Sequence, residues 1–230
     1  MTPSPERKPL LNGASIEIRS SAAAGSETIV LTTAHCTIVA VDIEGFGRPY
    51  RTNVNQVRAR HGMYRAMHQA FDAAGIPWTS CHREDRGDGI LILAQADVPK
   101  VLFVDRLPDA LVQALAAHNS VHPLEERIRL RLALHAGEIT YDGHCVTSSS
   151  ITRTFRLVDA AALRTRLAKS TATLAVISSD WFYDEVIRHS ERSAARSYRS
   201  INVTAKETAT RAWIRLVHGL GAELQPGLAG

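Results

Sequence analysis

The spacing of apolar positions along the chain predicts a mixture of short strands and amphipathic helices. The β-branched run over residues 36–41 predicts a buried strand, and apolar positions at helical spacing over residues 53–74 predict a helix that Gly75 ends. Ile128 and three leucines alternate with Arg129, Arg131 and Ala133 over residues 128–135, which predicts a strand with one buried face. Further strands are expected at 15–19, 78–83, 89–94, 137–141, 174–177, 200–205 and 209–217, and further helices at 108–118, 148–158, 159–168 and 180–189.

This order of elements, with strands and helices mixed and several hairpin signals, predicts an α+β fold in which helices cover a sheet. Residues 1–33 carry prolines and a run of Ser, Ala and Gly, so we expect a flexible N-terminal arm there. Residues 34–217 are expected to form one domain, and the glycine-rich residues 218–230 a C-terminal tail.

The composition narrows the class of protein. Of 230 residues, 45% are hydrophobic and 22% charged, which is typical of a globular domain. The net charge is +4, but no tract of basic and aromatic residues predicts a nucleic-acid surface. No run of 18 apolar residues predicts a membrane span. Three cysteines without metal-ligand spacing are typical of reduced thiols, so we expect a cytoplasmic protein.

Two aspartates stand at glycine-broken turns next to apolar runs. Asp42 ends the run from Val39, and Asp88 lies in the sequence Arg86-Gly87-Asp88-Gly89. A carboxylate at the end of a buried strand is costly unless it is paired, and two of them suggest a divalent cation. The simpler interpretation is that Asp42 caps a turn and that Asp88 belongs to an Asp-Gly β-turn.

Residues 42–47, Asp-Ile-Glu-Gly-Phe-Gly, resemble the Asp-Ile-x-Gly-Phe-Thr segment of class III nucleotidyl cyclases, and residues 87–88 resemble the Gly-Asp hairpin of that family. Residues 131–137 are similar to its Arg-Val-Gly-Ile-His-x-Gly strand. The resemblance implies a ferredoxin-like antiparallel sheet covered by helices. It also implies conversion of a nucleoside triphosphate to a 3′,5′-cyclic nucleotide and pyrophosphate. Two Mg²⁺ or Mn²⁺ ions would be held by Asp42, Asp88 and the Ile43 carbonyl.

Residues 150–157 are similar to the family's Val-Asn-x-Ala-x-Arg-Leu segment. The resemblance implies that Arg156 stabilises charge on the transferred phosphate. Thr152 stands where the family has an asparagine that orients the ribose. Lys206 matches a lysine that contacts the triphosphate, although Glu207 replaces the glycine that usually follows it.

Two further positions bear on the base. In the family, guanylate cyclases place Glu and Cys where this chain has Glu84 and Cys145, which implies GTP. The standalone bacterial pyrimidine cyclases of antiphage defence offer an alternative, UTP or CTP, and Arg48, Tyr50 and Arg51 would then narrow the pocket. The family's site forms between two subunits, so a homodimer is implied.

Two other interpretations remain open. Thr152 and Glu207 favour a cyclase-homology domain that has lost turnover and binds nucleotides or proteins, whereas both aspartates and Arg156 argue against it. A nucleic-acid polymerase palm also pairs aspartates on a ferredoxin-like sheet, but the chain lacks the basic and aromatic tracts expected of one.

Overall fold

The computed structural model describes residues 13–22, 25–192, 195–205 and 208–219. The helices are α1 Asn53–Ala74, α2 Leu102–Asp105, α3 Leu107–Val121, α4 Ser149–Val158, α5 Ala161–Ala168 and α6 Asp180–Phe182. The strands are β1 Ala14–Ala22, β2 Gly25–Ile43, β3 His82–Asp85, β4 Gly89–Gln95, β5 Leu130–Tyr141, β6 Val146–Thr147, β7 Leu174–Ser179, β8 Arg199–Ala205 and β9 Thr208–Val217. In these ranges no helix is long and apolar enough to cross a membrane.

The strands form one nine-stranded sheet in the order β3-β4-β2-β5-β7-β9-β8, with β1 paired to β2 and β6 paired to β5. The α+β fold expected from the sequence is confirmed. The expectation of an antiparallel sheet is wrong for one pair, because β5 and β7 run parallel. A parallel pair needs a crossover connection, and α4 and α5 lie in the segment between these two strands.

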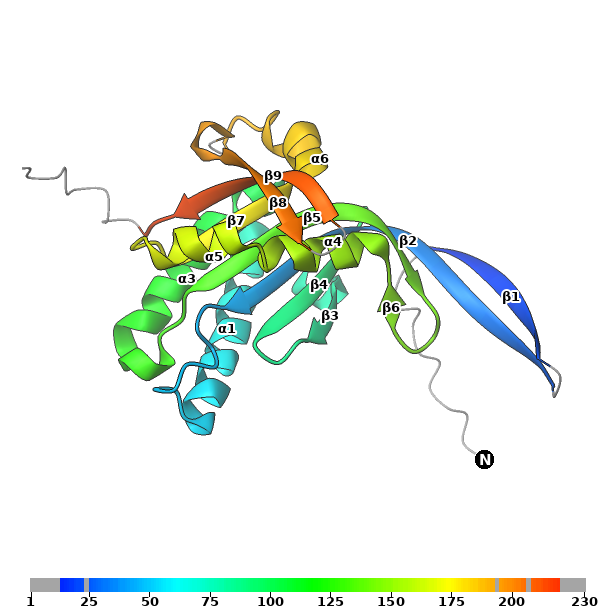
Figure 1. The fold of residues 1–230 in the computed structure, drawn as a ribbon, viewed down its shortest axis with the longest axis horizontal. Coiled ribbons are helices and arrows are strands. Elements are labelled where there is room, and N and C mark those ends of the chain that lie inside the picture. Colours follow the sequence, from blue (N-terminus) through cyan, green and yellow to red (C-terminus); the bar gives the residue numbers. More distant parts are fainter. Residues whose placement is uncertain (1–12, 23–24, 193–194, 206–207, 220–230) are drawn as a thin grey trace, which may run out of the picture.

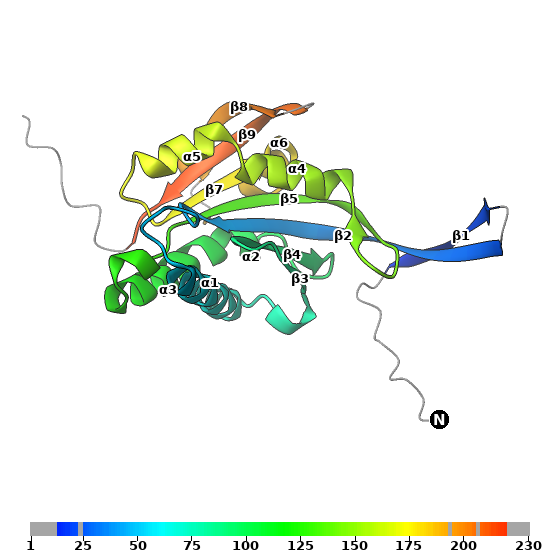
Figure 2. The same ribbon diagram turned by 60° about the horizontal axis from the view of Figure 1, so that its bottom comes forward.

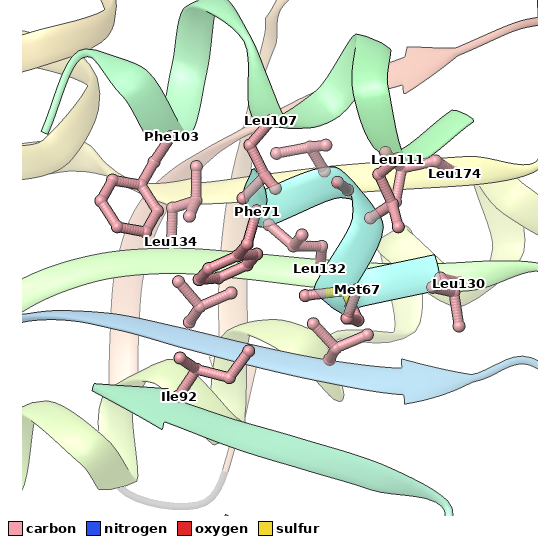
Figure 3. Packing of buried hydrophobic residues seen from close by; sticks show 14 of the residues in the cluster. Met67, Phe71, Ile92, Phe103, Leu107, Leu111, Leu130, Leu132, Leu134 and Leu174 are labelled. Atoms are coloured by element: carbon pink, nitrogen blue, oxygen red, sulfur yellow. The ribbon is translucent and has the colours of Figure 1, made fainter. Parts of the chain in front are cut away.

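Helices cover both faces of the sheet (Figure 2). The helices α1, α2 and α3 lie on one face, and α4 and α5 lie on the other (Figures 1 and 2). Side chains of α1 and α3, among them Met67, Phe71 and Leu111, pack on Leu130, Leu132 and Leu134 of β5 (Figure 3). The odd-numbered residues of β5 face α4 and α5, where Ala133 is fully buried. The strand is therefore buried on both faces, and the single buried face expected for residues 128–135 is wrong.

Several boundaries differ from the sequence expectation. Residues 137–141 continue β5 and do not form a separate partner strand. The expected strand at 78–83 is a short 3-10 turn at Trp78–Ser80 followed by β3. The helix expected over 180–189 is the short α6 followed by a π-helical turn, Tyr183–Ile187. Each of these segments is short, so tertiary contacts decide its conformation.

The N-terminal segment contains more structure than the single short strand expected at 15–19. The strand β1 pairs with the first half of β2, from Ala14 opposite Thr33 to Ala22 opposite Gly25. The two strands form a ribbon that projects from the body of the molecule (Figure 2). β2 then continues into the centre of the sheet and ends at Ile43, directly before the turn of the candidate site.

Candidate active site

Asp42 and Asp88 lie at the same end of two neighbouring strands. Asp42 is the penultimate residue of β2 and pairs in register with Gly89, the first residue of β4. The backbone N–H of Ile43 donates to the carbonyl of Asp88 at 2.9 Å. The structure therefore brings together the two aspartates that the sequence singled out.

The turn that carries Asp88 is shaped by its glycines and by Asp85. Gly87 has a φ of +80°, in the left-handed region that favours glycine. A Cβ at Gly89 would lie 2.1 Å from the carbonyl oxygen of Val41, so only glycine permits this approach to β2. The N–H of Gly87 donates to Oδ1 of Asp85 at 2.8 Å. Asp85, and not Asp88, caps the turn.

The side chain of Asp88 has no structural partner in the described ranges. The residue is exposed, and no hydrogen bond or ion pair joins its carboxylate to another described residue. Asp88 also raises the pKa of Asp42, so the two charges influence each other. An exposed carboxylate that supports no local structure is available to a ligand.

Asp42 is held in a different way. It is 8% exposed, and Nε and Nη2 of Arg131 each donate to one of its carboxylate oxygens at 2.7 Å. Burial raises the pKa of Asp42 to about 6, because the guanidinium of Arg131 only partly offsets the lost hydration. The carboxylate is thus mainly ionised at neutral pH. It pairs with an arginine and does not cap a turn.

The sequence did not assign a role to Arg131. Its alternation with leucines indicated a strand residue, but the pairing with Asp42 depends on the register of β2 and β5, which places the two residues opposite each other. Sequence patterns within one strand do not determine which residue of another strand lies opposite.

The donor set at this end of the sheet fits a magnesium-like cation. The described residues contain no cluster of three or more His, Cys, Asp and Glu side chains that could hold a metal ion. However, Mg²⁺ is commonly bound through one or two carboxylates, with waters and substrate phosphates completing the shell. Asp42 and Asp88 provide such carboxylates. Asp42 is also a buried anion whose charge one arginine does not fully compensate.

Helix α4 carries Arg156 and Thr152 next to each other. Ser148 caps this helix by accepting the N–H of Ser150 at 2.9 Å. Thr152 and Arg156 are four residues apart, so they lie on one side of the helix. Thr152 is exposed, and its hydroxyl donates to the carbonyl of Ser148 at 3.2 Å.

The turn of Asp88 also contacts α4. The guanidinium carbon of Arg86 lies 5.2 Å from the ring centroid of Phe155, the residue before Arg156. Asp159, at the C-terminal end of α4, raises the pKa of Asp42. The end of α4 and the aspartate pair therefore belong to the same part of the molecule.

The structure does not bring Glu84 and Cys145 together within one chain. Through the strand registers, Glu84 lies level with Ala40 of β2. Cys145 directly precedes β6, and β6 pairs with the end of β5 that lies level with Thr32. Those two positions are eight residues apart along β2, which corresponds to about 26 Å of extended strand.

The three residues predicted to bind the substrate have different surroundings. The Glu84 carboxylate is already engaged, by Nε2 of His82 at 3.0 Å and by Arg86. Cys145 is an exposed free thiol, whereas Cys36 and Cys81 are free thiols in the core. Lys206 and Glu207 lie outside the described residues.

Comparison with solved structures identifies the fold. An adenylate/guanylate cyclase/hydrolase from Silicibacter pomeroyi matches 81% of this chain and 99% of its own with a TM-score of 0.57 at 19% identity. The guanylyl cyclase Cya2 matches 86% of this chain and 98% of its own, with a TM-score of 0.55 at 15% identity. The catalytic core of a rhodopsin-guanylyl cyclase with converted specificity matches 80% of this chain and 97% of its own, with a TM-score of 0.53 at 13% identity.

No family model matches the sequence, and no curated protein matches it. The likeness is therefore one of three-dimensional structure. It extends over about four-fifths of this chain and nearly the whole of each of these three chains. This chain has the fold of the adenylate and guanylate cyclase catalytic domains.

Proposed function

We propose that this protein is a nucleotidyl cyclase that converts a nucleoside triphosphate to a 3′,5′-cyclic nucleotide and pyrophosphate. The observation that carries the proposal is the pair of aspartates at the ends of β2 and β4. Asp88 is exposed and unpaired among the described residues, and Asp42 beside it is buried and ionised. On a cyclase fold, this pair provides the carboxylates needed for metal-assisted phosphoryl transfer.

The roles of the residues follow from the resemblance to the class III cyclases. Asp42, Asp88 and the backbone carbonyl of Ile43 would hold two Mg²⁺ or Mn²⁺ ions. When bound, such ions neutralise charge on the triphosphate and make the ribose 3′-hydroxyl more acidic. Arg156 is assigned to the charge that develops on the transferred phosphate, where a preorganised guanidinium lowers the barrier. Thr152 is assigned to the ribose, and Lys206 to the triphosphate.

We infer that the complete site forms between two copies of the chain. The resemblance to the class III cyclases supports this arrangement, because the site of that family takes its metal aspartates from one subunit and its base, arginine and lysine contacts from the other. A two-fold homodimer places the same surfaces of both chains against each other and forms two equivalent sites. Each site would take its aspartates from one chain and Arg156 from the other.

For the base, Glu84 favours GTP, because a carboxylate accepts from the N–H groups of guanine. Cys145 of the same chain is level with a position eight residues away along β2, so the register does not support its contact with the same base. The existing pairing of Glu84 with His82 and Arg86 would have to exchange for that contact. A smaller pyrimidine base, as in antiviral defence, is the alternative, and product identification distinguishes the two.

The proposal is tested by incubating the pure protein with each of the four ribonucleoside triphosphates and Mn²⁺, and identifying products by mass spectrometry. Asp88→Asn is the critical variant, because the carboxylate of Asp88 makes no hydrogen bond or ion pair with another described residue. We expect its turnover to fall at least about a hundredfold, since metal ions contribute several kcal/mol to such transition states. The matched control is Asp72→Asn, an exposed aspartate on α1 whose carboxylate pairs only with His68 among the described residues. Equal turnover in Asp88→Asn and wild type contradicts the assignment.

A second candidate function is a nucleotide-binding module without turnover. It is favoured by Thr152, whose hydroxyl already donates to the Ser148 carbonyl and whose side chain lacks an amide. Nucleotide binding measured by calorimetry, without any product under either Mg²⁺ or Mn²⁺, would establish this alternative.

A further inference from the structure

Two neighbouring ion pairs lie at the candidate metal site. On the face of the sheet covered by α4 and α5, Asp42 pairs with Arg131. Just beyond the paired strands, Glu44, which follows the end of β2, pairs with Arg129, which precedes the start of β5, at 3.0 Å. The backbone supports this second pair, because the N–H of Glu44 donates to the carbonyl of Arg129 at 2.9 Å. Two arginines, Arg131 in β5 and Arg129 directly before it, therefore hold two carboxylates at the end of β2.

Arg129 connects these ion pairs to the C-terminal end of α5. Its Nε donates to the carbonyl of Ala172 at 2.9 Å, and its Nη2 donates to the carbonyls of Leu167 and Ser170. These carbonyls lie at and just beyond the C-terminal end of α5, where a cation is favoured by the helix dipole. Arg129 is thus a structural anchor, and its neighbour Arg131 is placed by the same stretch of chain.

Arg131 makes a more specific contact than the anchor does. Its two N–H groups match the two oxygens of Asp42, and the side chains are only 10% and 12% exposed. A bidentate pair of this kind fixes both the position and the plane of the carboxylate. A carboxylate has about four acceptor sites, so two remain for another ligand while the arginine is bound.

We propose that Arg131 is a positioning residue for the divalent cation, acting through Asp42. This inference rests on the proposed function, since it requires Asp42 to be a metal ligand. Arg131 holds Asp42 in one orientation, so the cation does not have to order that side chain when it binds. Groups that orient metal-binding side chains typically contribute 10- to 100-fold in metal affinity.

The test measures the binding of Mn²⁺ in the absence of nucleotide. Electron paramagnetic resonance detects binding as a loss of the signal of the free ion. Arg131→Lys keeps the positive charge but removes the fork of two parallel N–H donors. We expect its dissociation constant for Mn²⁺ to rise about tenfold or more. The matched control is Arg211→Lys, because Arg211 makes the same kind of bidentate pair with Asp180, at 2.7 and 3.1 Å. That control should bind Mn²⁺ as wild type does.

The outcomes separate this inference from the function on which it rests. Absence of Mn²⁺ binding in wild type overturns the role of Arg131, whereas the proposed function is decided separately by the formation of a cyclic nucleotide in the turnover assay. Binding in wild type with an unchanged affinity in Arg131→Lys overturns only the role of Arg131. Circular dichroism establishes whether each variant is folded, and Arg131→Gln repeats the test with an amide donor if the lysine variant is unfolded. Loss of fold in both variants would assign Arg131 to stability alone and overturn the proposal.

Discussion

Two residues of the same type have different tasks here because their surroundings differ. Asp42 is buried and bound on both oxygens by Arg131, while Asp88 is exposed and has no described partner. Removing one partner of a buried ion pair leaves an uncompensated charge, which typically costs about 3–5 kcal/mol. Asp42→Ala therefore perturbs the fold as well as the site, and variants of Asp88 give the cleaner test of function.

His135 provides a prediction about pH. It is 6% exposed, its Nδ1 lies 2.8 Å from the hydroxyl of Ser179, and burial lowers its pKa to about 4, with Arg153 and His35 contributing. The unfolded chain, with a histidine pKa near 6.5, binds more protons between pH 6.5 and 4, so acid destabilises the fold. This contribution is complete above about pH 6.5 and lost as the pH falls to about 4.

We expect the free energy of unfolding of wild type to fall by about 3 kcal/mol more than that of His135→Gln between pH 7 and pH 4. Urea denaturation at a series of pH values measures this difference. The raised pKa of Asp42 acts in the opposite direction in both proteins, so the comparison isolates His135. Parallel pH profiles for the two proteins would show that His135 is not held neutral.

At the scale of elements, the site depends on how closely β4 and β2 approach at their ends. Gly89 allows this approach, since a side chain there would meet the Val41 carbonyl oxygen at 2.1 Å. The contact of two strand backbones cannot yield as a flexible side chain can. The position of Asp88 beside Asp42 is therefore a property of the strand pair.

Gly89→Ala should force the two strands apart and lower the free energy of unfolding by about 1–3 kcal/mol, the usual cost of overpacking. Turnover should fall with it, because the two aspartates separate. The control is Gly47→Ala, where a Cβ meets nothing within 4 Å. Chemical denaturation and turnover assays check both variants. If the Gly89→Ala protein were as stable and active as the Gly47→Ala protein, the close approach would not be important.

At the scale of the whole molecule, the proposed site needs two chains. In a two-fold dimer, a chain lacking Asp88 and a chain lacking Arg156 together retain one intact site. Each variant alone forms only defective sites. The arrangement of the subunits can thus be tested without knowing the substrate base.

The Asp88→Asn and Arg156→Ala variants, each nearly inactive alone, are unfolded, mixed in equal amounts and refolded together. We expect the mixture to recover about a quarter of wild-type turnover, because half of the dimers contain one chain of each variant and half of the sites in those dimers are intact. The control is the same treatment of each variant by itself. No recovery, in a mixture that size-exclusion chromatography shows to be dimeric, would place both residues in one chain's site.

Local sequence signals determined many of the elements. The helix expected at 53–74 is α1, and Gly75 ends it with a φ of +76° as expected for a C-cap. The helix expected at 148–158 begins at its capping serine, and the two C-terminal strands lie within one residue of their expected ends. The two aspartates could also be selected from the sequence, because apolar runs and glycines next to them are visible in it.

Only the tertiary structure decided the contacts that cross strands. The burial of β5 on both faces follows from α4 and α5 covering the second one. Strand register decides three of these contacts: the bidentate pairing of Arg131 with Asp42, the close approach of Gly89 to β2, and the separation of Glu84 from Cys145. The physical reason is that a periodic pattern in one strand determines which side chains share a face, whereas the partner of each side chain depends on how residues far apart in the sequence are aligned.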